Sequence, residues 1–429
     1  MNQHGTRDVL AWVSELLTES MLIDGHNDLP SRLRKVAGYS VERLDDERQD
    51  VHTDLVRLRR GMVGGQFWSV WVPSHLDEDA AAAATLEQID AVYRLASRYP
   101  DEIGISFTAD GATEQFARGR IASLIGIEGG HSIAGSLGVL RMFARLGVRY
   151  LTLTHNDDTD WAASATGMDP GAGLSLQGEA ILREMNRIGL IVDLSHTAES
   201  TQLDALRVAE APVIFSHSSL RRLTDHPRNV SDRVLSRLVA NGGVLQCTFV
   251  PEFVSSEVAQ WDLDRREACT SLGIEPGNDG NVLGTKPHYP SAPMPAESPH
   301  ETLARNARER ALRTLPISDE QRASLLEWDA KNPRPSATLA QVADHFDAAR
   351  EQVGIDHLGV SGDYDGTDEF PRGLENVSRY PYLFAELANR NWSRSDLVRI
   401  AGENILRVMR DVEQVASEPM WPTAVRVEE

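Results

Sequence analysis

Residues 21–28 read MLIDGHND, an apolar run that ends in His26 and Asp28. Short apolar runs of this kind are typical of buried parallel strands. Because alternate residues of a strand point to the same face, His26 and Asp28 are expected to direct an imidazole and a carboxylate into the same space. This stretch therefore predicts a strand that carries half of a site for a divalent cation.

Seven further apolar runs follow along the chain, and helical patterns separate most of them. Eight strands that alternate with helices are what a (β/α)8 barrel requires. A doubly wound open sheet is the competing α/β architecture, but polar residues recur at nearly every strand end, which favours a TIM-type barrel. The expected strands are Met21–Asp24, Phe67–Val72, Ala122–Glu128, Tyr150–Thr154, Leu190–Leu194, Val213–Ser216, Val244–Phe249 and His357–Gly362. The expected helices are Ala80–Arg98, Ser136–Leu146, Leu176–Ile188, Ala198–Ala209, Asp232–Ala240 and Leu339–Gln352.

One segment interrupts this alternation between the seventh and eighth expected strands. Residues 254–335 are polar and irregular, with a Gly-Asn-Asp-Gly turn at 277–280 and charged helical patches at Glu301–Arg313 and Asp319–Lys331. We predict that this segment is an insertion within a single barrel domain spanning residues 1–429. It lies on the side where barrel loops carry function, although a peripheral decoration is equally compatible with the sequence.

The composition is that of an ordinary globular enzyme, and it argues against several kinds of partner. Asp and Glu outnumber Lys and Arg by 64 to 43, and the formal net charge of −21 leaves no basic surplus for nucleic acid phosphates. The N-terminal stretch lacks the basic start and unbroken apolar run of a signal peptide, and no run approaches the roughly 18 apolar residues of a membrane span. The two cysteines imply no disulfide framework. We therefore expect a cytoplasmic protein with neither nucleic acid nor membrane as a partner.

Ionisable residues end most of the expected strands. In a barrel the carboxyl ends of the strands converge on one mouth, so these residues would meet in space although they are far apart in sequence. Taken singly, each has a plainer explanation: a hydrogen-bonded histidine, a helix-capping glutamate or a turn-forming aspartate. Their joint occurrence at corresponding positions favours a site for zinc or a similar metal. The residues are His26, Asp28, Glu128, His155, His196, His217 and Asp363.

Longer motifs around these residues carry a resemblance to a known family. The chain resembles the membrane (renal) dipeptidases, peptidase family M19 of the amidohydrolase superfamily, whose fold is a (β/α)8 barrel with a binuclear zinc centre. The motifs spread over most of the chain and are long enough to be specific. The matching stretches are Ile23–Pro30, Gly64–Val70, Ala122–Ile133, Tyr150–His155, Pro212–Ser219, Arg228–Val230 and Gly362–Gly366.

The resemblance implies a two-zinc centre in each chain. His26 and Asp28 would hold the first zinc ion, and His196 and His217 the second. Glu128 would bridge both ions. A hydroxide shared by the two ions would be the nucleophile.

The resemblance also implies roles in catalysis and substrate binding. His155 would donate a hydrogen bond to the oxyanion of the tetrahedral intermediate. Asp363 would take the proton of the nucleophile and pass it to the leaving amine. Arg228 would bind the terminal carboxylate of the substrate. The implied activity is hydrolysis of dipeptides, L,L and also L,D, by a homodimeric enzyme.

The chain also departs from the family pattern. Mammalian members carry a secretion signal, disulfides and a lipid anchor, and the sequence shows none of these, so membrane attachment is not expected. Phe253 stands where those members have a tyrosine near the substrate. The acidic loop at Asp157, Asp158 and Asp160 suggests a preference for a basic N-terminal residue, and Arg221 and Arg222 suggest one for an acidic C-terminal residue. Exposure of all these charges to solvent is the alternative.

Two other functional classes stay open at this point. A different amidohydrolase reaction, such as deamination or ester hydrolysis, uses a similar metal centre, and a fold alone does not fix the reaction. A non-catalytic zinc-binding protein is the second alternative. Arg228 favours a substrate with a free carboxylate, while His155 and Asp363 are not needed merely to hold a metal.

Overall fold

Eight parallel strands close into a barrel in the computed structural model, which describes residues 6–274 and 317–419. Their order around the barrel follows the chain, and pairing of Asp24 with Val360 closes the ring between the last strand and the first. The prediction of a TIM-type barrel is confirmed, and an open sheet is excluded. The strands of the ring are β1 (Leu22–Asn27), β2 (Val63–Trp71), β4 (Ile121–Glu128), β5 (Val148–Thr152), β6 (Ile191–Asp193), β7 (Ile214–Ser218), β8 (Val244–Cys247) and β9 (Leu358–Val360).

A short strand outside the ring, β3 (Ile103–Ile105), pairs with the start of β4. Further along β4, from Ile125 to Glu128, β5 occupies the same edge. β3 is absent from the expected strands. The other three-residue strands, β6 and β9, were expected because they lie within longer runs at 190–194 and 357–362.

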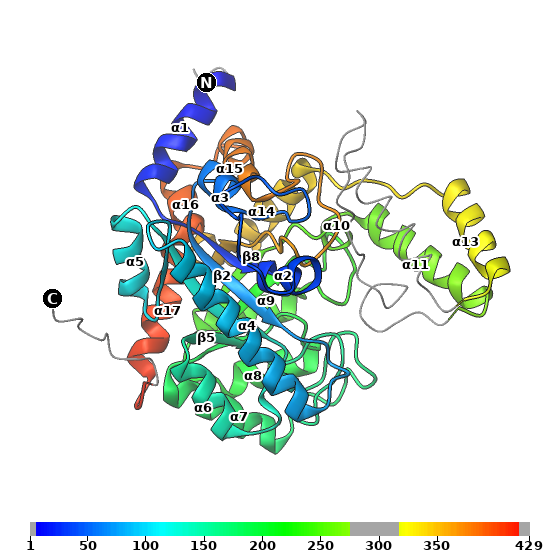
Figure 1. Ribbon diagram of the computed structural model, residues 1–429, viewed down its shortest axis with the longest axis horizontal. Coiled ribbons are helices and arrows are strands. Elements are labelled where there is room, and N and C mark those ends of the chain that lie inside the picture. Colours follow the sequence, from blue (N-terminus) through cyan, green and yellow to red (C-terminus); the bar gives the residue numbers. More distant parts are fainter. Residues whose placement is uncertain (1–5, 275–316, 420–429) are drawn as a thin grey trace.

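Helices surround the barrel (Figure 1). All six expected helices are present, and α7 begins and ends at the expected residues because Ser175 caps its N-terminus and Gly189, with φ of 76°, ends it. The α-helices are α1 (Thr6–Glu19), α2 (Leu29–Ala37), α3 (Leu55–Arg60), α4 (Glu78–Arg98), α5 (Ala109–Ala117), α6 (Leu137–Arg145), α7 (Leu176–Ile188), α8 (Glu199–Val208), α9 (Asp232–Asn241), α10 (Pro251–Val254), α11 (Ser256–Ser271), α13 (Asp319–Lys331), α14 (Leu339–Val353), α15 (Tyr380–Asn389), α16 (Arg394–Val398) and α17 (Asn404–Val415). Short helical turns are η1 (Gly130–Ile133), η2 (Ile355–His357), η3 (Val377–Arg379) and the π-helical η4 (Arg399–Glu403).

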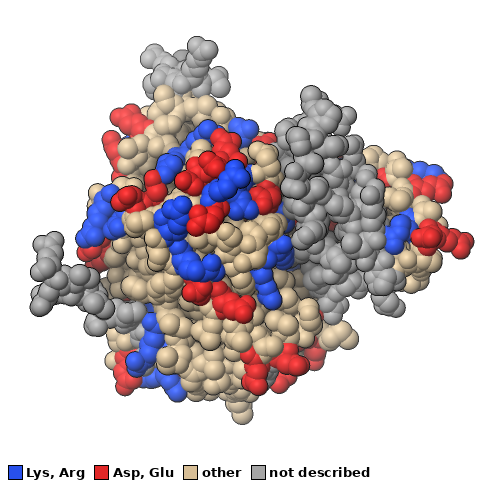
Figure 2. All heavy atoms as spheres, in the orientation of Figure 1, with Lys and Arg blue, Asp and Glu red and all other residues tan. Residues whose placement is uncertain are grey.

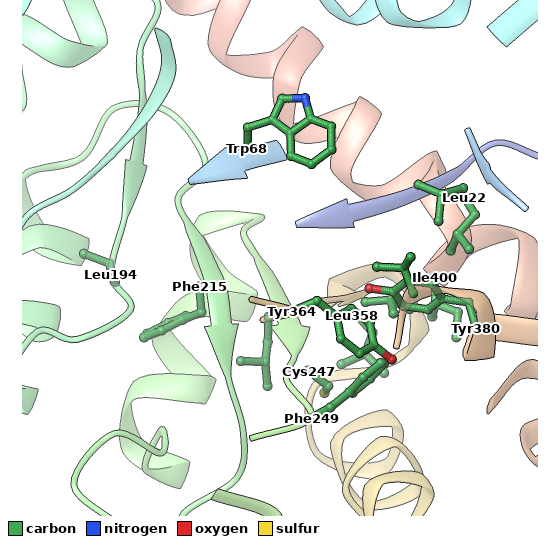
Figure 3. Packing of buried hydrophobic residues seen from close by; sticks show 14 of the residues in the cluster. Leu22, Trp68, Leu194, Phe215, Cys247, Phe249, Leu358, Tyr364, Tyr380 and Ile400 are labelled. Carbon is green, nitrogen blue, oxygen red and sulfur yellow. The ribbon is translucent and has the colours of Figure 1, made fainter. Parts of the chain in front are cut away.

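The two ends of the barrel differ in chemistry. At the N-terminal end, apolar residues from the first halves of the strands form a cluster with Ile405, Met409 and Val412 of α17, so this helix covers that end. Around the side of the barrel, Phe249, Tyr364 and Tyr380 pack together, with ring centroids 5.6–5.9 Å apart (Figure 3). The ionisable strand-end residues lie at the opposite, C-terminal mouth.

The region expected to be an insertion lies between β8 and β9. Helix α13 has the predicted bounds of Asp319–Lys331, whereas α11 was not expected from the polar sequence. The two helices project together from one side of the barrel (Figure 1, right). The predicted patch at Glu301–Arg313 lies outside the described residues, and the domain boundaries themselves stay a prediction.

The cysteines, the helices and the surface charges further characterise the fold. Cys247 and Cys269 are both buried free thiols. Among the described residues, no helix combines the length and the apolar composition that crossing a membrane requires. On the face shown in Figure 2, acidic and basic side chains lie next to each other. Exposed ion pairs of the described residues include Arg98–Glu42 at 3.1 Å.

Candidate metal centre

Every ionisable residue predicted at a strand end lies at the C-terminal mouth of the barrel. His26 is the penultimate residue of β1, Glu128 is the last residue of β4, and His217 lies within β7. The others follow their strands within three residues. These are Asp28 after β1, His155 after β5, His196 after β6 and Asp363 after β9.

The side of the mouth formed by β1 and β9 combines one imidazole with three carboxylates. His26 Nε2 lies 3.3 Å from Asp28 Oδ2, 3.5 Å from Glu128 Oε2 and 3.9 Å from Asp363 Oδ1. The ligand atoms of His26, Asp28 and Asp363 all lie within 4.8 Å of one another. We call this the β1 side.

The opposite side of the mouth is rich in imidazoles. Glu128 Oε1 lies 2.9 Å from His196 Nε2, 3.4 Å from His217 Nε2 and 3.7 Å from His155 Nε2. The Nε2 atoms of His196 and His217 are only 2.9 Å apart. We call this the β6–β7 side.

Glu128 joins the two sides because each of its carboxylate oxygens faces one of them. Its Oε2 atom also accepts a hydrogen bond of 3.1 Å from Ser69 Oγ. Burial would raise the pKa of Glu128, but the imidazoles of His26 and His155 outweigh burial and hold that pKa well below its ordinary value. Glu128 is therefore a buried carboxylate that stays ionised between two sets of ligands.

Each of three histidines makes a hydrogen bond through Nδ1, on the side away from the site. His196 Nδ1 donates to Asn156 Oδ1 at 3.1 Å, which leaves Nε2 as the unprotonated nitrogen. His26 Nδ1 lies 2.9 Å from the hydroxyl of Tyr150, which is also 3.4 Å from the carbonyl oxygen of Gly25. Partners of this kind fix the orientation of metal-binding histidines and their tautomer.

The third of these histidines, His217, is held by a two-step relay. Its Nδ1 lies 2.8 Å from Ser216 Oγ, and Ser216 Oγ donates in turn to Asp193 Oδ2 at 2.6 Å. Asp193 also accepts from the backbone amides of Ser195 and Ser216, so it connects β6 to β7. This arrangement places the proton of His217 on Nδ1 and leaves the lone pair of Nε2 facing the site.

These residues fit divalent cations. His26 Nε2 and Asp28 Oδ1 are buried, and neither has a hydrogen-bond partner among the described residues. Burial lowers the pKa of His196 to about 3 and that of His217 well below its ordinary value, so both are neutral, as metal ligands must be. Two lone pairs 2.9 Å apart repel each other unless a cation lies between them. Imidazole and carboxylate donors together suit zinc or a related first-row metal.

Three of the eight described non-glycine residues with positive φ lie at the same mouth. His196, Asp363 and Asp365 have φ of 67°, 54° and 68°, in the left-handed region that non-glycine residues seldom adopt. In the loop after β9, Asp24 Oδ1 accepts from the backbone N–H of Gly362 at 3.0 Å, which fastens the loop to β1. Burial and the charges of Asp28 and Glu128 raise the pKa of Asp363 well above its ordinary value. Asp363 is thus suited to hold a proton.

Arg228 and His155 line the site without belonging to its centre. Burial lowers the pKa of Arg228 to about 10, and Glu128 and Asp363 act in the opposite direction. Its guanidinium lies 5.1 Å from the ring of Phe253, and its Nη1 is buried without a hydrogen-bond partner among the described residues. The ring of His155 lies 4.3 Å from that of His196 and 5.3 Å from that of Trp71. The structure therefore brings all eight predicted site residues together, while their roles stay predictions.

The charged residues thought to select substrate side chains have other partners. Asp158 accepts backbone N–H groups of Ser164 and Met168, which makes it a loop-stabilising residue. Arg221 pairs with Glu199 at 3.3 Å, and Arg222 approaches Glu351 on the outer helix α14. Asp158, Arg221 and Arg222 thus have partners within the chain, and a preference for charged substrate residues stays a prediction.

Sequence reasoning missed the residues that hold the histidines in place. Ser216 directly precedes His217, and Asn156 directly follows His155. Their position next to predicted site residues was the signal that could have identified them. Asp193 is a carboxylate within the apolar run at 190–194, at the end of β6, which is itself a sign of a buried partner. Tyr150 gave no such signal. It fits because Gly126 has no side chain: a Cβ there would lie 2.0 Å from the tyrosine ring.

Comparisons with known proteins agree with this architecture. The sequence model of the membrane dipeptidases (peptidase family M19) matches residues 10–422. The chain is 37% identical over 421 residues to the dipeptidase verJ of Clonostachys rogersoniana, an alignment that covers 95% of this chain and 88% of that protein.

Solved structures of similar fold include two bacterial proteins. The probable dipeptidase PvdM from Pseudomonas aeruginosa has a TM-score of 0.76 at 22% identity, covering 96% of this chain and all 100% of that one. A metallo peptidase from Rhodobacter sphaeroides, liganded with a phosphinate mimic of the dipeptide L-Ala-D-Ala, has a TM-score of 0.68 at 20% identity, covering 92% and 99% of the two chains. At this level of identity the likeness shows the shared barrel.

Proposed function

Because the chain belongs to the membrane dipeptidase family, peptidase family M19, and is a metallo-dipeptidase by that membership, we propose that it hydrolyses L,L and L,D dipeptides with two zinc ions. The observation that carries the proposal is the division of the site by Glu128. One carboxylate oxygen faces the β1 side and the other faces the β6–β7 side. A single bridging carboxylate between two ligand sets is what a two-metal hydrolase needs.

The ligand assignment follows from these contacts. His26 and Asp28 would hold one zinc ion, His196 and His217 the other, and Glu128 would contact both. When bound, the two ions would polarise the scissile carbonyl and lower the pKa of a water positioned between them. The buried position of the ligands, with His26 and His217 almost inaccessible, supports a permanently held centre.

His155 and Asp363 have positions suited to the chemical steps. The Nε2 atom of His155 lies 3.7 Å from Glu128, at the rim of the site, so it would donate a hydrogen bond to the oxygen of the carbonyl under attack. Asp363 would take a proton from the attacking water and deliver it to the amine that leaves. Its raised pKa allows it to carry that proton between the two steps.

Arg228 supports a short substrate with a free carboxylate. Its buried guanidinium has an unpaired Nη1 and a fork geometry that matches a carboxylate. A longer peptide would place an uncharged amide against this buried cation. The phosphinate mimic of L-Ala-D-Ala bound to the Rhodobacter sphaeroides protein supports extending the substrate range to a D-residue at the second position.

The test is a dipeptide screen combined with metal analysis. The protein as purified is expected to contain zinc and to hydrolyse L-Ala-L-Ala and L-Ala-D-Ala. A chelator should abolish turnover, and added zinc should restore it. L-Ala-L-Ala amide is the matched control, because it lacks the carboxylate assigned to Arg228 and should be a poor substrate. Turnover that survives complete metal removal would contradict the proposal. The cytoplasmic location and the homodimer stay predictions.

A further inference from the structure

Arg334, in the segment after α13, contacts carboxylates from three separate elements. Its guanidinium lies 2.9 Å from Asp262 of α11 and 3.7 Å from Glu252 of α10, and it forms an ion pair with Glu369 in the loop after β9. The side chain is only 11% exposed. Removing this guanidinium would leave three partly buried carboxylates, 22–28% exposed, without their shared counter-charge.

A second arginine, Arg265, has a different structural role. Arg265 forms a two-pronged ion pair with Asp329, at 2.7 and 3.0 Å, which joins α11 to α13. The guanidinium groups of Arg265 and Arg334 lie 5.7 and 5.6 Å from the ring of Trp261. Arg265 therefore holds the helix pair together, whereas Arg334 connects this pair to the barrel.

The contact of Arg334 with Glu252 lies next to the pocket of Arg228. Glu252 precedes Phe253, whose ring lies 5.1 Å from the guanidinium of Arg228 and 4.7 Å from the ring of His226. The carbonyl oxygen of Phe253 accepts a 2.8 Å hydrogen bond from Asn229, next to Arg228. Any movement of α10 would therefore displace the wall against which Arg228 is packed.

The contact with Glu369 leads to the loop that carries Asp363. Glu369 precedes Phe370, whose ring packs 4.6 Å from that of Tyr364, the neighbour of Asp363. This loop has independent attachments, since Gly362 is bonded to Asp24 and Asp365 accepts from the backbone N–H of His52 at 2.7 Å. Helix α10 has only four residues. Of the two elements, α10 is the one that carries Phe253, in the wall of the Arg228 pocket.

We propose that Arg334 is a positioning residue through which the α11–α13 pair fixes α10, and that it thereby sets the pocket in which Arg228 binds the carboxylate of the substrate. This inference rests on the proposed function. Under this inference, α11 and α13 contribute to substrate binding through α10, and they do not contact the reacting atoms.

The experiment compares Arg334→Gln with Asp329→Asn, which breaks only the ion pair inside the helix pair. For L-Ala-L-Ala, Arg334→Gln is expected to raise KM by about tenfold and to leave kcat within about twofold, because binding is impaired more than chemistry. Arg334→Lys keeps the charge but not the fork, so it should recover part of the loss. Asp329→Asn should leave KM within about twofold of the wild-type value.

Hydrogen exchange supplies a readout that does not depend on turnover. Arg334→Gln should speed amide exchange in residues 251–254 and 226–230, and Asp329→Asn should not. Unchanged exchange in these segments overturns the inference, and so does an equal rise in KM for both variants. Failure of the proposed function is distinguishable, because the wild-type protein itself would then not hydrolyse the dipeptide, while the exchange comparison would still decide the role of Arg334.

Discussion

The two sides of the metal centre share Glu128 but differ in charge. The β1 side adds Asp28 and Asp363 to one imidazole, whereas the β6–β7 side adds the imidazoles of His196 and His217. Arg228 contributes positive charge to the second side, where it lowers the pKa of both histidines further. A cation on the β1 side would be held chiefly by charge, and one on the β6–β7 side by neutral nitrogen lone pairs.

The strongest way to break this comparison is to remove the group that both sides share. In Glu128→Gln one oxygen and the negative charge are lost, so neither ligand set is complete. We expect kcat/KM to fall by at least about 10^4-fold, equivalent to about 5.5 kcal/mol, and metal content per chain to fall with it. Steady-state kinetics and elemental analysis measure both quantities. Glu179→Gln, which removes a carboxylate from α7 away from the mouth, serves as control, and retention of full metal content by Glu128→Gln would refute the bridging role.

The next test separates proton transfer from metal binding on the β1 side. Asp363→Asn keeps the shape of the side chain but cannot carry a proton, so kcat should fall by about 10^2- to 10^3-fold. Because His26, Asp28 and Glu128 remain, metal content should stay near the wild-type value. Asp365→Asn is the matched control in the same strained loop, since its oxygen still accepts the N–H of His52. If Asp363→Asn loses its metal as well, Asp363 is a ligand and the proton carrier lies elsewhere.

The barrel could be predicted from the sequence because its signal is repeated. Each of the eight strands of the ring is an apolar run, and the strand ends carry the ionisable residues that the geometry of a parallel barrel must bring together. Helix α7 was predicted to the residue because a capping serine and a left-handed glycine mark its ends. Periodicity and capping are local properties, so one sequence is enough to show them.

Features that depend on contacts between distant segments could not be predicted. Tyr150 reaches His26 from 124 positions away, and Arg334 reaches Glu252 across the whole insertion. Helix α11 has no apolar face to reveal it, because much of its packing consists of ion pairs and aromatic contacts. Likewise, the sequence shows that Asp158 is charged, but it does not show that backbone N–H groups donate hydrogen bonds to its carboxylate. In each case the residue type was visible and the partner was not.

A third prediction sharpens the comparison by weakening one side at a time. Ser216→Ala removes the acceptor for His217 Nδ1, and Tyr150→Phe removes the partner of His26 Nδ1. Loss of such a partner typically costs 10- to 100-fold in metal affinity. We therefore expect Ser216→Ala to weaken only the β6–β7 ion and Tyr150→Phe only the β1 ion, by about that factor. Competition with a chelator of known affinity resolves the two binding steps, and a loss at both steps in either variant would show that the sides are not independent.

The smallest expected effect is a difference in how the two sides respond to pH. On the β1 side burial disfavours a charged His26, but Tyr150, Glu128 and Asp28 together outweigh burial and hold its pKa well above the ordinary value. His26 of the metal-free protein therefore carries a proton at neutral pH that a cation must displace, so affinity on this side should rise with pH, by about tenfold per unit below that pKa. On the β6–β7 side the pKa of His196 is about 3 and that of His217 is also depressed. Both are already neutral, and affinity there should be nearly flat between about pH 5 and 8.

Calorimetric titration of the metal-free protein with zinc in two buffers of different ionisation enthalpy counts the protons released at each step. We expect the β1 step to release at least about one proton. Asp363, whose pKa is also raised, can add to this release because a nearby cation would lower that pKa. Essentially no release is expected at the β6–β7 step. Tyr150→Phe should lower the affinity and also reduce proton release at the β1 step, because Tyr150 is one of the groups that raise the pKa of His26. Equal proton release at both steps would mean that the charge difference between the two sides does not survive in solution.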